Sequence, residues 1–167
     1  MIRNIISSEL NNLDILNTKF NWIPNSKQIR PNETTLNEKN KVLDLIESEW
    51  NSMKDYILHT VFDKNYVYQS NKKFVLDDNI SDTYKFQLSS FRYNLDHNSN
   101  HYILWLPRYT MDIKINESLI LYINRILENE IYKLVNHYNF DFAYYINPKP
   151  SIIDYFHLQV FWIEKFT

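Results

Sequence analysis

Residues 141–163, DFAYYINPKPSIIDYFHLQVFWI, place two polar side chains, His157 and Gln159, inside an apolar and aromatic run. Alternate side chains of a β-strand point to opposite faces. His157 and Gln159 therefore share one face with Tyr155 and Phe161. The other face carries only apolar side chains, namely Phe156, Leu158, Val160 and Trp162. The sequence predicts a two-faced strand whose apolar face packs into the core, while its mixed face meets water or lines a pocket.

The rest of the chain extends this pattern to an α+β fold. Apolar residues recur at helical spacing in two segments, 36–58, where Trp50 should face the core, and 117–138. Short aromatic and β-branched runs predict strands, at 66–69, 73–76, 83–95, 101–107, 140–146 and 152–163. This order predicts a single domain over 36–167, an antiparallel sheet with two long helices packed on it. Residues 1–35, interrupted by prolines, are predicted to be an irregular N-terminal arm.

Composition excludes several classes of protein. The chain has 167 residues, of which 44% are hydrophobic, and this suffices for one folded core. A net charge of −2 argues against a broad nucleic-acid footprint, which needs clustered Lys and Arg. No apolar window is long enough for a membrane span, and the absence of cysteine favours an intracellular, cytoplasmic location. The absence of glycine excludes phosphate-binding glycine loops and leaves Asn and Asp for turns with a positive φ.

The turn before the last strand supplies three candidate ligand-binding residues. Asn147 and Ser151 carry hydrogen-bonding side chains in NPKPS, and Lys149 lies between the two prolines. An anion held close to the histidine face would find donors and a positive charge there. The alternative interpretation is an ordinary Asn-Pro and Pro-Ser turn that binds nothing.

Two further segments carry candidate site residues. His101 and Trp105 lie on one face of the strand HYILWLP, and they would border the same pocket if this strand neighbours the last one. Arg92 and Tyr93 in SSFRYNLD would supply a cation and an aromatic wall. Alternatively, His101 is a surface residue at a strand end. The remaining histidines show no metal-ligand spacing, so neither a metal nor a cofactor is predicted.

Three segments, FRYNLD, HYILWLPR and FAYYINPKPSIIDYFHLQVFW, together resemble the uncharacterised, mainly fungal family of N-acetylglucosamine-induced protein 1. The resemblance covers about residues 45–163. The matching residues are Phe91, Tyr93, His101, Trp105, Asn147, Ser151, Ile152 and His157. Arg92 replaces a proline of the family pattern, and Gln159 replaces its second closing histidine.

More distantly, the same order of elements is similar to the superfamily of histidine-triad proteins and galactose-1-phosphate uridylyltransferases. This similarity implies a nucleophilic role for His157 and a phosphate contact for Gln159. Tyr155 stands where the first histidine of that triad would be.

We therefore expect a site for a phosphorylated small molecule, a nucleotide or a sugar phosphate, with His157 as the catalytic residue of a hydrolase or transferase. The alternatives are a non-catalytic ligand-binding module and a protein-interaction module, with a protein partner or a second copy of the chain.

Overall fold

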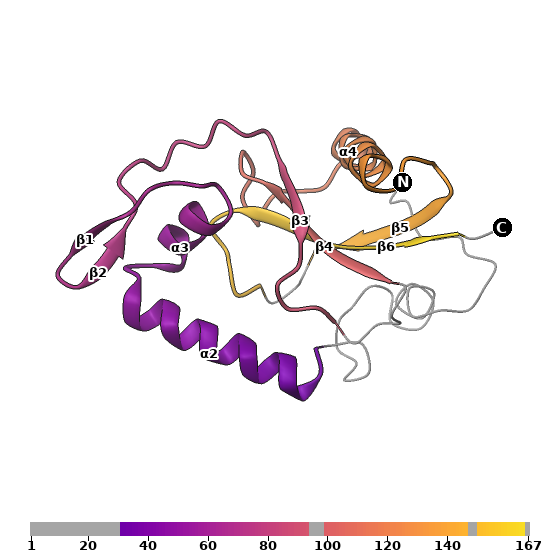
Figure 1. The fold of residues 1–167 in the computed structure, drawn as a ribbon. Coiled ribbons are helices and arrows are strands. Elements are labelled where there is room, and N and C mark those ends of the chain that lie inside the picture. The colour runs from indigo at the N-terminus through magenta and orange to yellow at the C-terminus, as the bar shows by residue number, and fades with distance from the viewer. Residues whose placement is uncertain (1–30, 94–98, 147–149, 166–167) are drawn as a thin grey trace.

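The structure is a computed structural model that describes residues 31–93, 99–146 and 150–165. Its helices are α2 (Glu33–Glu49), α3 (Met53–Thr60) and α4 (Glu117–Val135). Its strands are β1 (Val67–Gln69), β2 (Lys72–Phe74), β3 (Lys85–Leu88), β4 (Asn100–Leu106), β5 (Phe140–Tyr145) and β6 (Phe156–Glu164). Four strands form one antiparallel sheet in the order β3-β4-β6-β5, and β1 pairs with β2 in a separate hairpin (Figure 1). The predicted α+β class is confirmed.

The apolar face of the sheet packs against α4 (Figure 1). Leu158 and Val160 of β6 are fully buried in one cluster with Ile123 and Leu127 of α4. Phe142 of the neighbouring β5 belongs to the same cluster. The predicted apolar face of the last strand is therefore confirmed, and burial of such side chains contributes about 1.5–3 kcal/mol each.

The predicted helix over 36–58 is two helices, so that part of the prediction is wrong. The first, α2, ends at Glu49, and Ser52 caps the start of α3 by accepting a hydrogen bond from the Asp55 N–H. Because Ser52 competes for backbone donors, the chain leaves the helical path between Trp50 and Ser52. Trp50 is buried, as expected, and its ring contacts Tyr56 and other aromatic residues of this layer.

Two predicted strands extend more than two residues beyond the observed strand at one end. Segment 83–95 yields only the four residues of β3, which pair with β4 up to Leu88 opposite Tyr102. After Leu88, the Ser89 N–H still donates to the His101 carbonyl, and pairing then ends. The strand predicted over 152–163 begins at Phe156. Residues 94–95 lie outside the described residues.

The hairpin between β1 and β2 turns at Ser70 and Asn71, which both have a positive φ. Two consecutive positive φ values match the two-residue turn that suits the twist of a hairpin. Without glycine, the described residues adopt a positive φ at Asp63, Ser70, Asn71 and Asn136. Asn and Asp thus supply most of these positions.

The mixed face of the sheet is covered by α2 and α3 (Figure 1). Ile46 of α2 and Ile57 of α3 are buried in one cluster with Trp105 of β4 and Tyr155. The sheet therefore lies between two helical layers. Among the described residues, no helix is both long and apolar enough to cross a membrane.

Candidate functional site

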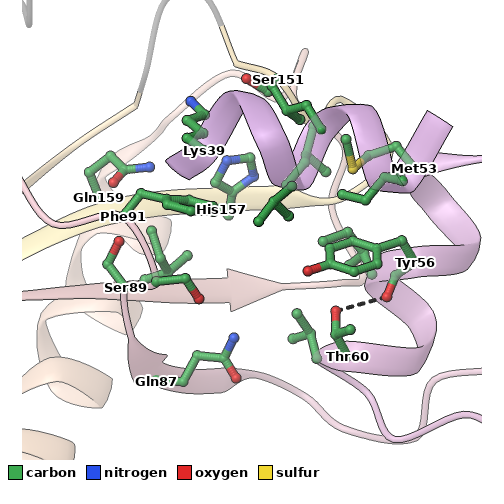
Figure 2. A pocket seen from close by; sticks show the side chains of 18 of the residues that line it. Lys39, Met53, Tyr56, Thr60, Gln87, Ser89, Phe91, Ser151, His157 and Gln159 are labelled. Carbon is green, nitrogen blue, oxygen red and sulfur yellow. Dashed lines mark hydrogen bonds between the residues drawn. The ribbon is translucent and has the colours of Figure 1, made fainter. Parts of the chain in front are cut away.

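A cavity of about 410 Å³ lies between the helices α2 and α3 and the mixed face of the sheet (Figure 2). Its helical wall is mainly aliphatic, with Leu36, Val42, Leu43, Ile46, Met53, Ile57 and Val61. The opposite wall is more polar and includes Gln87, Ser89, Ser90, Ser151, His157 and Gln159. A pocket that combines apolar walls with a few convergent polar groups is the usual form of a small-molecule site.

A buried carboxylate fixes the helical wall of the cavity. Asp55 of α3 is 7% exposed and accepts hydrogen bonds from Asn51 Nδ2 at 3.0 Å and Ser52 Oγ at 2.7 Å. It also accepts from the Val75 N–H at 2.8 Å, which ties α3 to the segment after β2. Burial by itself would raise the pKa of Asp55, but these hydrogen bonds outweigh burial and lower the pKa below 3.8. Asp55 is therefore ionised at neutral pH.

His157 is buried in the sheet wall, with 5% of its surface exposed. Its Nδ1 lies 3.0 Å from the Tyr155 carbonyl oxygen. A carbonyl only accepts hydrogen bonds, so Nδ1 carries the proton and Nε2 of the neutral ring keeps its lone pair. Burial lowers the pKa of His157 below 6.5, and the hydrogen bond to the Tyr155 carbonyl opposes that shift only in part. No described residue forms a hydrogen bond with Nε2, and the ring projects into the cavity (Figure 2).

Trp105 of β4 lies directly opposite His157 of β6, and the two ring centroids are 4.7 Å apart. The sequence had predicted this proximity only on condition that the two strands pair, and they do. Trp105 and Tyr93 both line the cavity, and so does Ser151 at its edge. Contact with Trp105 restricts rotation of the imidazole, which keeps the unprotonated nitrogen directed at the cavity.

Gln159 follows two positions after His157, so its side chain lies about 7 Å further along the same face. Its Oε1 is 2.6 Å from His101 Nε2. His101 does not line the cavity, is 1% exposed, and accepts a hydrogen bond on Nδ1 from the Tyr93 N–H at 3.2 Å. Burial lowers the pKa of His101 to about 4. The structure therefore places His101 behind Gln159 instead of at the cavity surface.

Two other predicted site residues, Arg92 and Tyr155, do not line the cavity. Arg92 donates through Nη2 to the Ser99 carbonyl at 2.8 Å and is not among the lining residues. Tyr155 is buried against Phe62 and contributes its carbonyl, not its ring, to the site. Asn147 and Lys149 lie outside the described residues.

Sequence reasoning missed the contribution of the first helix. Lys39 lines the cavity from α2 and is the one formally charged side chain among the described lining residues when His157 is neutral (Figure 2). Its position three and four residues before Val42 and Leu43 places it on the same helix face as these lining residues. That spacing was visible in the sequence, but nothing in it showed that this face would oppose His157.

The described residues contain no cluster of three or more histidine, aspartate or glutamate side chains that could hold a metal ion. Comparison of the sequence with protein-family profiles and with curated proteins gives no match. Among solved structures, a crystal structure of HTC1 is similar, with 12% sequence identity and a TM-score of 0.50. The similarity covers 91% of this chain and 82% of that chain. At this identity, it bears on the fold alone.

Proposed function

We propose that the cavity binds a phosphorylated small molecule, a nucleotide or a sugar phosphate, and that His157 acts on its phosphoryl group as in the histidine-triad proteins. The observation that carries this proposal is the state of His157. Its Nδ1–H donates to the Tyr155 carbonyl, so the unprotonated Nε2 faces the cavity. A neutral imidazole with one nitrogen held by a carbonyl is a prepared nucleophile or general base.

The chemistry follows from this arrangement. The Nε2 lone pair attacks phosphorus, a P–N bond forms, and the P–O bond to the leaving group breaks with its electron pair. The leaving oxygen takes a proton from solvent. Water then attacks the phosphorus and loses a proton to solvent. The P–N bond breaks, its electron pair returns to Nε2, and His157 is again neutral. The Tyr155 carbonyl accepts from Nδ1–H throughout and offsets the positive charge that the ring carries while it bears the phosphoryl group.

The remaining lining residues fit a ligand with two unlike ends. Lys39 supplies positive charge, and the Gln159 amide and the Ser89 hydroxyl supply hydrogen-bonding groups near His157 (Figure 2). The aliphatic wall of α2 and α3 would contact the base or other apolar part of the ligand. Burial of apolar ligand surface there contributes about 25 cal/mol per Å².

The test compares wild type with His157→Asn, which keeps a short side chain able to donate to the Tyr155 carbonyl but lacks Nε2. Isothermal titration with AMP, UDP, UDP-sugars and glucose 1-phosphate measures binding, and phosphorus NMR measures turnover. His137→Asn is the matched control, since His137 pairs with Glu164 and is not among the residues that line the cavity. We expect turnover by wild type and the control, and none by His157→Asn.

Three results would contradict parts of the proposal. Equal turnover by His157→Asn and wild type would exclude the nucleophilic role. Binding without turnover in every protein would favour the non-catalytic module, and absence of binding with all of these ligands would favour a protein-interaction role.

A further inference from the structure

His101 is held rigidly without touching the cavity. Its ring stacks on Phe161 with centroids 4.6 Å apart, and Tyr93 packs edge-on against it at 4.8 Å. It is 1% exposed and lies on β4, directly opposite Phe161 of β6. The ring therefore has one orientation, and its two nitrogens face fixed partners.

Those partners determine which nitrogen carries the proton. The Tyr93 N–H can only donate, so His101 Nδ1 must accept and is unprotonated. A neutral ring then carries its proton on Nε2, which points at the Gln159 side chain 2.6 Å away. A charged ring would place a second N–H against the Tyr93 N–H, and burial also opposes that state.

Because Nε2–H donates, the atom of Gln159 that faces His101 must be the acceptor, Oε1. The side-chain nitrogen of Gln159 is then directed away from His101, and Figure 2 shows it on the side of His157. We propose that His101 is a positioning residue that holds the Gln159 amide with its NH₂ group toward the cavity. The Tyr93 N–H thus fixes the tautomer of His101, and His101 in turn fixes the orientation of the Gln159 amide. As a result, a hydrogen-bond donor faces the cavity.

This arrangement defines the chemistry of the group bound at the polar end. The ligand must present an acceptor oxygen to the Gln159 NH₂ group. It must also present an electrophilic atom or a hydrogen-bond donor to His157 Nε2, and positions 157 and 159 are about 7 Å apart along the strand. An oxygen-rich head group such as a phosphoryl group meets both requirements. This part of the inference rests on the proposed function, whereas the orientation of Gln159 does not.

The orientation is tested on the full chain without any ligand. Long-range ¹H–¹⁵N NMR of the imidazole rings distinguishes the two neutral tautomers, with His101→Phe and His157→Asn used for assignment. We expect His101 to carry its proton on Nε2 and His157 on Nδ1 at pH 7. A proton on His101 Nδ1, or a charged His101 ring at pH 7, would overturn the proposal even if a phosphorylated ligand binds.

The consequence for the ligand is tested with a double-mutant cycle. His101→Phe keeps an aromatic ring between Tyr93 and Phe161 but releases Gln159, and Gln159→Leu removes the donor itself. We expect each variant to bind AMP about 10-fold more weakly than wild type, the loss expected for one hydrogen bond, and the double variant to bind no more weakly than Gln159→Leu. His137→Phe is the control and should bind AMP like wild type.

A purely structural role for His101 predicts a different result. The losses in AMP affinity would then multiply in the double variant, and this outcome would refute positioning through Gln159. If wild type binds none of AMP, UDP, the UDP-sugars and glucose 1-phosphate, the proposed ligand class fails, while the NMR measurement still decides the orientation of the amide.

Discussion

Substitution of Asp55 by alanine should lower the free energy of unfolding more than the same substitution at an exposed aspartate or glutamate. The carboxylate is 7% exposed and accepts from two side chains and from the Val75 N–H. Asp55→Ala leaves the Val75 N–H without its acceptor, which costs about 1–3 kcal/mol. It also removes the hydrogen bonds that Ser52 and Asn51 donate to a charged group, so we expect a total loss of about 3–5 kcal/mol in the free energy of unfolding.

The assay is urea unfolding at pH 7, followed by tryptophan fluorescence because Trp50 belongs to the same layer. For a chain of this length the loss corresponds to a fall of roughly 10 °C in Tm. Asp78→Ala is the matched control, since Asp78 pairs with Lys54 at the surface and should change stability by at most about 1 kcal/mol. A loss of less than 1 kcal/mol for Asp55→Ala would refute the reasoning that this network holds α3 in place.

Three further predictions concern titration, the core and the α2–α3 break. Burial depresses the pKa of His101 from 6.5 to about 4 in the folded protein. As pH falls, His101 is therefore protonated in the unfolded chain at a higher pH than in the folded one. About 3 kcal/mol of the free energy of unfolding should be lost between pH 6.5 and pH 4. Urea unfolding across that range should show a smaller loss for His101→Phe, and an equal loss would contradict the assignment. Ile131→Ala should cost about 2–5 kcal/mol by the same assay, whereas Leu134→Ala, at a side chain 53% exposed, should cost less than about 1 kcal/mol. Ser52→Ala should cost about 1 kcal/mol through loss of the helix cap, and an unchanged Tm would argue against its role in separating α2 from α3.

The strands and the long helix near the C-terminus were predictable because their side-chain periodicity is strong. The alternation in β6 determined both faces of that strand, and the 3.6-residue period marked α4. The break between α2 and α3 was not predicted because the apolar spacing continues through it from Ile46 to Ile57. The signal was present in Ser52 and Asp55, three residues apart, which form a cap.

The candidate site was predictable only in part. Strand periodicity predicted that His157 and Gln159 share one face. The contact of His157 with Trp105 depended on the pairing of β4 with β6, which the structure shows. The cover over that face comes from α2 and α3, about 100 positions earlier in the chain, and no local pattern determines such a contact. The same limit applies to Arg92, whose side chain turns to the Ser99 carbonyl instead of the cavity.

The two walls of the cavity come from different parts of the chain. The aliphatic wall belongs to α2 and α3, whose neighbours include the β1–β2 hairpin, and the polar wall belongs to the four-stranded sheet and the segments next to its strands. An occupant therefore touches two layers that are otherwise joined mainly by apolar packing, and it should couple their local unfolding. Amide hydrogen exchange in α2 would then slow when the cavity is filled, although α2 contributes no residue to the sheet. Exchange rates in this helix would therefore measure how much of the protein has an occupied cavity.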